Sequence, residues 1–329
     1  MTTETSPTSP ADDLCAAILN LPDGLGQTFA VLVDVDGETR FEGYGGVLPG
    51  SAQVVGPETP LLSWSMAKSV THLLTGFAHD DGLLDVEAPA PVAEWAHDER
   101  QNITIRHLLQ MTSGLRWNEA YTPDGPSDVV EMLFRSGQHD VGGYAVQSPL
   151  VAEPGTTWVY SSGTTNILCR VLRDVLQTAG TDTRSYLNDR LLGPAGIGSV
   201  AESQCRVDAT GTWIGSTFLY LTGSEWLRLG RFMLDGGRSN GAQVVAPRWV
   251  AEASTEGSVP TGEPYRYSNH WWLWPLGSAT PDAFAAFGYE GQHVVMVPSK
   301  NAVVVRLGAT PDAHKPFVRA MIHRLIEVL

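Results

Sequence analysis

The pattern of hydrophobic and polar positions near the N-terminus predicts a helix followed by a β-hairpin. Apolar residues recur at the i, i+3, i+4, i+7 spacing of one helix face over Ala11–Leu21. Two segments rich in β-branched and aromatic residues follow, Thr28–Val35 and Thr39–Gly43, and Asp36-Gly37 between them is a strong hairpin-turn signal. The chain is therefore expected to begin with a helix and two antiparallel strands.

The middle of the chain carries helix-type patterns, and the last third returns to strand-type patterns. The expected helices are Ser65–Phe77, Thr104–Met111, Asp128–Phe134, Thr164–Leu176, Arg184–Leu192, Gly223–Leu234 and Pro247–Ala253. The expected strands after them are Tyr267–Trp274, Ala283–Tyr289, Gln292–Val297 and Ala302–Leu307, before a final helix at Pro316–Leu329.

Strands at both ends and helices between them predict an α+β fold, in which both termini complete one sheet flanked by the N- and C-terminal helices. The expected organisation is a disordered leader at 1–10, a sheet domain formed by 11–75 and 240–329, and a mostly helical inserted domain at 76–239. A cleft between the two domains is where a functional site is expected.

Composition narrows the possible partners and the compartment. The 329 residues carry a formal net charge of −15, with no basic run, which disfavours binding to nucleic acid or to anionic membranes. The first ten residues lack the basic and apolar regions of a secretory signal, and no apolar stretch is long enough to span a bilayer. Cys15, Cys169 and Cys205 are odd in number and widely spaced, as reduced thiols would be. We therefore expect a cytoplasmic protein.

Lysine use singles out one candidate catalytic residue. Of 21 basic residues only three are lysines, and Lys68 alone lies in mostly small or apolar surroundings. If a helix opens at Ser65, Lys68 lies one turn further along the same face. A desolvated lysine can accept the proton of a serine hydroxyl, so Ser65 and Lys68 are a candidate nucleophile and base. The alternative is a helix lysine whose aliphatic chain covers apolar surface.

Two further segments could complete such a site. Tyr160 lies in a hydroxyl-rich loop before a helix, where a buried phenol near Lys68 could pass a proton to a leaving group, although a packed aromatic is the simpler interpretation. Glycines at Gly288 and Gly291 flank a strand entry, where a backbone N–H could form an oxyanion hole with that of Ser65. An ordinary β-turn is the alternative for this segment.

Other catalytic motifs are rejected. Gly237–Gly241 spells Gly-x-Ser-x-Gly, but it follows a predicted helix rather than a strand, so we expect a polar turn. The nine histidines are scattered, and there is neither a zinc-binding spacing nor a glycine-rich phosphate loop. The sequence therefore predicts no metal and no cofactor.

Taken together, the three segments resemble a known family. Ser65-Met66-Ala67-Lys68, Tyr160-Ser161-Ser162 and the strand entry at Tyr289 are similar to the three motifs of serine β-lactamases and penicillin-binding proteins. Their order and separation resemble the branch of class C β-lactamases, D-aminopeptidases and esterases. Within that branch the likeness is greatest to the group of 6-aminohexanoate-dimer hydrolases and related carboxylesterases. The resemblance implies a β-lactamase-like antiparallel sheet over nearly the whole chain.

The resemblance also implies residue roles. Ser65 would be the acylated nucleophile, Lys68 its base and Tyr160 a proton-transfer partner, while the N–H groups of Ser65 and Gln292 would bind the oxyanion. Substrate contacts are expected from Tyr121, Ser162, Tyr289, Glu290 and Gly291.

Two departures from the family pattern bear on the substrate. Ser162 stands where β-lactamases usually carry Asn, and Tyr289-Glu290-Gly291 stands where Lys-Thr-Gly or His-Thr-Gly is usual. Because no lysine or histidine stands in this motif, anionic substrates such as penicillins are disfavoured. The leading hypothesis is a serine hydrolase that cleaves small esters or amides through an acyl-enzyme on Ser65. The alternatives are a β-lactamase or D-alanyl peptidase, and a non-catalytic binding protein that retains the fold.

Overall fold

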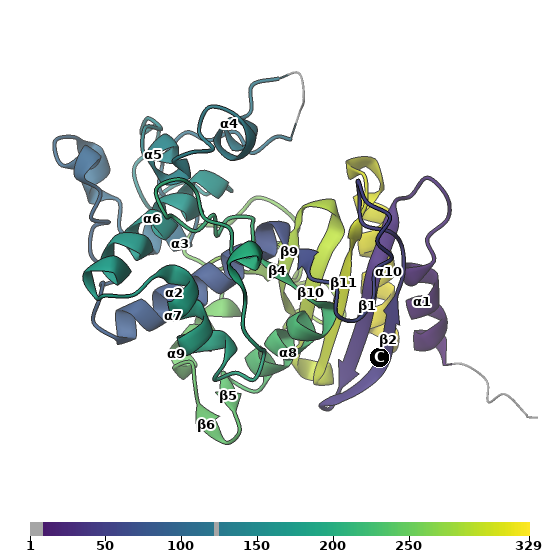
Figure 1. The fold of residues 1–329 in the computed structure, drawn as a ribbon. Helices are drawn as coiled ribbons and strands as arrows, with labels where there is room; N and C mark the ends of the chain where they lie inside the picture. The colour runs from purple at the N-terminus through teal and green to yellow at the C-terminus, as the bar shows by residue number, and fades with distance from the viewer. Residues whose placement is uncertain (1–8, 122–124) are drawn as a thin grey trace, which may run out of the picture.

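The computed structural model describes residues 9–121 and 125–329, and its centre is a seven-stranded sheet (Figure 1). The strand order is β2-β1-β11-β10-β9-β8-β7, with every neighbouring pair antiparallel. The bounds are β1 Gln27–Val35, β2 Glu38–Tyr44, β7 Arg266–Tyr267, β8 Trp272–Leu273, β9 Phe284–Gly288, β10 Gln292–Val297 and β11 Ala302–Ala309. Strands from both ends of the chain thus form one sheet, as the sequence predicts.

Helices cover both faces of this sheet. Helices α1 and α10 pack together on one face, and α8 packs against β1, β10 and β11 on the other. The bounds are α1 Pro10–Leu19, α2 Ala67–Asp80, α3 Ile105–Leu109, α4 Asp128–Phe134, α5 Val141–Ala145, α6 Ser162–Thr178, α7 Thr183–Leu187, α8 Gly223–Leu234, α9 Pro247–Ala253 and α10 Lys315–Val328. None of the helices in the described ranges is long and apolar enough to cross a membrane.

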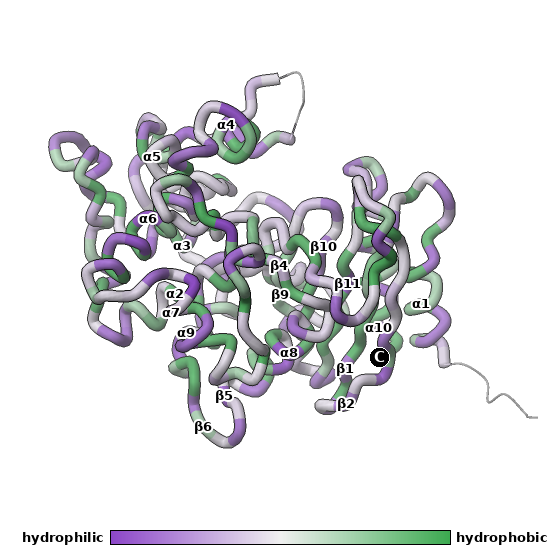
Figure 2. The backbone as a smooth tube through the Cα atoms, in the orientation of Figure 1, coloured by the Kyte–Doolittle hydropathy of each residue, from purple (hydrophilic) through white to green (hydrophobic). Residues whose placement is uncertain are grey.

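The side chains of β1 show how the sheet divides the core into two. Ala30 and Leu32 join the large cluster shared with the helical region, while Val31 and Val33 join the cluster under α1 and α10. Because both faces are covered, β1 is buried along most of its length and reads as a continuous apolar run, visible as green tube in Figure 2.

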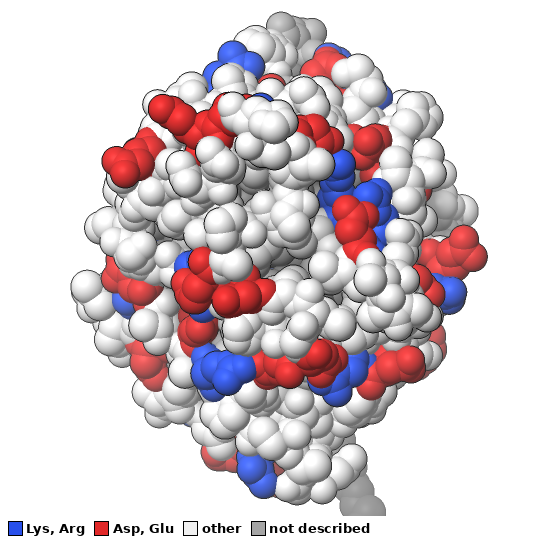
Figure 3. Space-filling view, turned by 90° about the vertical axis from the view of Figure 1, so that its left-hand side faces the viewer, with Lys and Arg blue, Asp and Glu red and all other residues white. Residues whose placement is uncertain are grey.

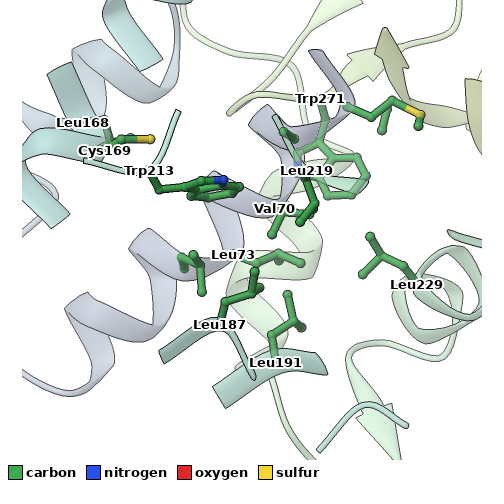
Figure 4. Close-up of a cluster of buried hydrophobic side chains, with 14 of the residues drawn as sticks. Val70, Leu73, Leu168, Cys169, Leu187, Leu191, Trp213, Leu219, Leu229 and Trp271 are labelled. Carbon is green, nitrogen blue, oxygen red and sulfur yellow. The ribbon is translucent and has the colours of Figure 1, made fainter. Parts of the chain in front are cut away.

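Helix α2 runs through the middle of the helical region and is enclosed on nearly every side. Val70 and Leu73 of α2 lie in one buried cluster with side chains from surrounding segments, among them Leu187 of α7, Leu229 of α8 and Trp271 (Figure 4). Even Lys68 in the first turn is only 1% exposed. The helix that follows the nucleophile is therefore a rigid, buried element, which suits a site that must be held in a fixed geometry.

Most of the predicted elements are confirmed, and two short hairpins add to them. These are β3 (Leu61–Leu62) with β4 (Tyr220–Leu221), and β5 (Arg238–Ser239) with β6 (Ala242–Gln243). The Gly-x-Ser-x-Gly segment is the turn of the second hairpin, with Asn240 and Gly241 at positive φ, so its assignment as a polar turn is confirmed.

Three predictions need correction or lie out of reach. The single strand Tyr267–Trp274 is wrong: β7 and β8 are separate short strands, because the chain reverses at His270, whose φ is +65°. Of the leader predicted at 1–10, residues 1–8 lie outside the described part of the chain, and Pro10 already belongs to α1, capped by Ser9. Helix α8, assigned to the inserted domain, packs on the sheet.

Charged side chains cover the outside in an uneven mixture. On the face shown in Figure 3, groups of Asp and Glu are interspersed with fewer Lys and Arg, in keeping with the net charge of −15.

Candidate active site

Ser65 lies in a tight turn that joins β3 to α2. Residues Trp64–Met66 form one turn of 3₁₀ helix, and the α-helix starts only at Ala67. Trp64 has φ +48°, an uncommon value for a bulky residue. Its indole N–H donates to the Glu290 carboxylate at 3.0 Å, and its ring meets Tyr289 edge to face at 5.2 Å. Contacts from the turn after β9 thus hold the nucleophile segment in a strained conformation.

Lys68 lies one turn beyond Ser65 and is placed to act on it. The distance from Lys68 Nζ to Ser65 Oγ is 3.1 Å. Nζ also lies 2.9 Å from Ser162 Oγ and 2.9 Å from the Ser216 carbonyl oxygen. Burial lowers the pKa of Lys68 to about 8, against an opposing effect of the Glu119 charge. At pH 7 roughly one molecule in ten then has a neutral Lys68 that can accept a proton.

Tyr160 is the third member of the catalytic group, beside Ser65 and Lys68. The Lys68 ammonium nitrogen lies 5.1 Å from the centre of the Tyr160 ring. Burial and the nearby Glu119 charge raise the pKa of the phenol above its ordinary value, while a hydrogen bond with Ser65 works in the opposite direction. The phenol therefore stays protonated at neutral pH, which makes it a proton donor rather than a base.

The second motif is positioned by the start of α6. Ser161 caps this helix, accepting the backbone N–H of Thr164 at 2.9 Å, so Tyr160 ends the preceding loop and Ser162 is the first helical residue. The resemblance implied that Ser162 contacts substrate, but the side chain is fully buried, between Lys68 and Glu119, and does not line the cavity. Ser162 is part of the network behind the nucleophile.

Glu119 is a member of this network that the sequence did not single out. Its carboxylate accepts the Ser162 hydroxyl at 2.5 Å, the Ser162 backbone N–H at 2.8 Å and the Trp117 indole N–H at 2.5 Å. The chain places it 43 residues from Ser162 in a loop, and no local pattern marks such a contact. The Ser216 carbonyl, 148 residues from Lys68, was also missed.

The third motif reaches the site at the turn after β9. Gly288 packs against the nucleophile segment so closely that an added Cβ would lie 2.4 Å from the Ser63 carbonyl oxygen. Gly288, Tyr289 and Gly291 line the same cavity as Ser65. The Glu290 carboxylate is instead used to hold Trp64, and its carbonyl accepts from Arg306.

Gln292, expected to supply an oxyanion N–H, is the first residue of β10 and follows directly on Gly291, which lines the same cavity as Ser65. Its side chain is 3% exposed and bonds to the backbone of Gly308 in β11. The side chain is thus used inside the sheet, and the role of the backbone N–H stays a prediction.

An aromatic cavity of about 660 Å³ opens in front of Ser65. Tyr121 stacks on Tyr289 with ring centres 4.4 Å apart, which joins the loop after Glu119 to the turn after β9. The aromatic lining consists of Tyr121, Trp158, Tyr160, Tyr265, Trp272, Phe287 and Tyr289. Among the charged lining residues, Asp312 and Lys315 pair with each other. Within the described ranges, no group of three His, Cys, Asp or Glu side chains could hold a metal ion.

Comparisons with known proteins identify the family of this chain. The beta-lactamase family profile matches residues 23–326. The 6-aminohexanoate-dimer hydrolase of Paenarthrobacter ureafaciens is 26% identical over 276 residues, which cover 78% of this chain and 68% of that protein.

Two solved structures share the fold. A candidate 6-aminohexanoate-dimer hydrolase from Bacillus anthracis superimposes with a TM-score of 0.74 at 20% identity, covering 93% of this chain and 81% of the other. A family VIII carboxylesterase gives a TM-score of 0.71 at 16% identity, covering 98% and 99%. The chain belongs to the beta-lactamase family of serine hydrolases.

Proposed function

We propose that this protein cleaves ester or amide bonds of small molecules through an acyl-enzyme on Ser65. The observation that carries the proposal is the contact between Ser65 and Lys68, at 3.1 Å, beside a largely aromatic cavity that Ser65 lines. A buried lysine with a lowered pKa is a group that can activate a serine hydroxyl near neutral pH.

The acylation step follows from the positions of three side chains. As Ser65 Oγ bonds to the substrate carbonyl carbon, its proton passes to Lys68 Nζ. The tetrahedral intermediate then expels the alcohol or amine, which takes the proton of the Tyr160 hydroxyl while the Lys68 ammonium gives its proton to the Tyr160 oxygen. Water attacks the acyl-enzyme by the reverse route, so the carboxylic acid leaves and Ser65 regains its proton.

Two backbone N–H groups are assigned to the developing oxyanion. One is that of Ser65, in the first turn of the helical segment, where N–H groups lack helical partners. We assign the second to Gln292, as the resemblance implies, because it follows directly on Gly291, which lines the same cavity as Ser65. Such donors are each worth roughly 3 kcal/mol of transition-state stabilisation.

The lining of the cavity supports a partly apolar substrate. The third motif offers no lysine or histidine for a carboxylate, and the nearby Lys315 is paired with Asp312. Arg319, which also lines the cavity, lies over the rings of Tyr265 and Phe287. The relatives named as a 6-aminohexanoate-dimer hydrolase and a carboxylesterase point to oligoamides and short esters as the first substrates to try. The free, buried cysteines agree with the cytoplasmic location expected from the sequence.

A substrate panel tests the proposal. Purified protein is given neutral p-nitrophenyl esters, linear amino-terminated oligoamides, and the β-lactam nitrocefin, with Ser65→Ala as the control. We expect turnover of esters or oligoamides that depends on Ser65, with slow or no turnover of nitrocefin. Rapid nitrocefin turnover would instead support the β-lactamase alternative, and no turnover of any substrate would support a binding protein.

A further inference from the structure

Glu119 presents an arrangement of hydrogen bonds that the acylation mechanism does not by itself explain. Its carboxylate lies in contact with Ser162, and Ser162 in turn lies in contact with the catalytic base Lys68. The hydrogen bonds that lead from Glu119 toward the nucleophile pass through Ser162 and then Lys68.

The donors and acceptors in this chain can be assigned without ambiguity. A carboxylate accepts hydrogen bonds and donates none, so the single hydrogen of the Ser162 hydroxyl goes to Glu119 Oε1, 2.5 Å away. Ser162 Oγ can then only accept from Lys68 Nζ, at 2.9 Å. The Ser216 carbonyl oxygen, also 2.9 Å from Nζ, is likewise an acceptor.

This assignment fixes the orientation of the neutral lysine. A neutral amine has two N–H groups and one lone pair, and both N–H groups are committed to Ser162 Oγ and the Ser216 carbonyl. The third direction at Nζ points to Ser65 Oγ at 3.1 Å, and the lone pair occupies it. On the basis of the function proposed above, we propose that Glu119 is a positioning residue that, through Ser162, turns the lone pair of Lys68 toward the Ser65 hydroxyl.

The same carboxylate stabilises the ammonium that forms when Lys68 takes the proton. Four titratable groups face Lys68: Glu119, Tyr160, Cys169 and His270. Burial raises the pKa of the Tyr160 phenol, raises the pKa of the Cys169 thiol to about 12, and lowers the pKa of His270 to about 3. These three groups are therefore uncharged at neutral pH, and Glu119 supplies the negative charge opposite the new ammonium.

Removal of the carboxylate would undo both effects. In Glu119→Gln a single amide oxygen replaces two carboxylate oxygens, so it turns to accept the Ser162 and Trp117 N–H groups and its N–H₂ donates to Ser162 Oγ. The Ser162 hydroxyl then donates to Lys68 instead of Glu119, and an N–H of Lys68 turns toward Ser65. Loss of the charge also leaves desolvation of Lys68 less opposed, so the pKa of the base falls.

The test compares Glu119→Gln with the wild type in ester hydrolysis over a range of pH. We expect kcat to fall about 10²-fold with little change in KM, as for a misaligned catalytic group. The acid limb of the kcat/KM profile should also move to lower pH, a shift that a merely structural residue would not cause. Glu153→Gln, the same change at an exposed side chain, should leave kcat and the pH profile unaltered.

Two substitutions at Ser162 give a second test that does not depend on the folding of the Glu119 variant. Ser162→Ala removes the relay, whereas Ser162→Asn can still accept from Lys68 with its carbonyl and donate to Glu119 with its amide. We expect Ser162→Asn to be at least about tenfold more active than Ser162→Ala, because the asparagine restores the hydrogen bonds that orient Lys68. Equal activity of the two variants would overturn the proposal, as would wild-type kinetics in Glu119→Gln.

A fluorophosphonate probe separates this inference from the function on which it rests. If the wild type is not labelled at Ser65, the proposed function fails and the role of Glu119 fails with it. If the wild type is labelled and Glu119→Gln keeps the wild-type rate and pH profile, the role of Glu119 alone is refuted.

Discussion

Gly288, the last residue of β9, is where the sheet touches the segment that carries the nucleophile. In Gly288→Ala the new methyl carbon would lie 2.4 Å from the Ser63 carbonyl oxygen, whereas ordinary contact begins near 3.4 Å. The backbones of β9 and the nucleophile turn must then separate by about 1 Å. Gly288 has φ −130°, which alanine adopts freely, so the expected effect is purely steric.

The consequences for stability and activity follow from this separation. Overpacking of this kind costs roughly 1–3 kcal/mol of unfolding free energy. A displacement of 1 Å at reacting groups lowers rates about 10²-fold, and here it would part Ser65 from Gln292. We expect urea denaturation and p-nitrophenyl ester hydrolysis of Gly288→Ala to show losses of these sizes.

Gly277→Ala is the matched control, because an added Cβ there meets no atom within 4 Å and φ is not positive. It should resemble the wild type in both measurements. Wild-type activity and stability in Gly288→Ala would refute the reasoning, since β9 would then not hold the nucleophile in position.

Three further predictions address the base, the acid and the turn beside the cavity. Because Lys68 must lose its proton before it can accept one, kcat/KM should rise with pH through an apparent pKa near 8, and a flat profile from about pH 6 to 9 would contradict this. Tyr160→Phe should lower kcat about 10²-fold with an unchanged Tm, and undiminished turnover would remove its role in proton transfer. Arg306→Met should lower the free energy of unfolding, measured in urea, by more than about 3 kcal/mol, because the buried guanidinium donates to the Glu290 and Gly291 carbonyls among other acceptors. A loss below about 1 kcal/mol would show that these carbonyls find other donors.

The sequence predicts those elements whose signals are local. Helices Asp128–Phe134 and Gly223–Leu234 have the predicted bounds, because a capping Ser127 or Thr222 stands immediately before an amphipathic stretch. The first hairpin is also confirmed, with Asp36 and Gly37 both at positive φ as the turn requires.

Features that depend on distant contacts were not predictable. The strained conformation of Trp64 is held by Glu290, 226 residues away, and the assignment of Ser65 to the start of an α-helix therefore missed the 3₁₀ turn. The part played by Glu119 depends on a contact with a helix that begins 43 residues later. Periodicity describes one element at a time, and these contacts form only when separate elements meet.

The central claim is that Ser65 carries the acyl group, and mass spectrometry of the enzyme after rapid quenching during ester turnover tests it most directly. We predict a mass increase equal to the acyl group on the peptide that contains Ser65, absent from Ser65→Ala, which should also lose ester hydrolysis. An adduct on a different residue, or wild-type hydrolysis by a folded Ser65→Ala variant, would contradict the account.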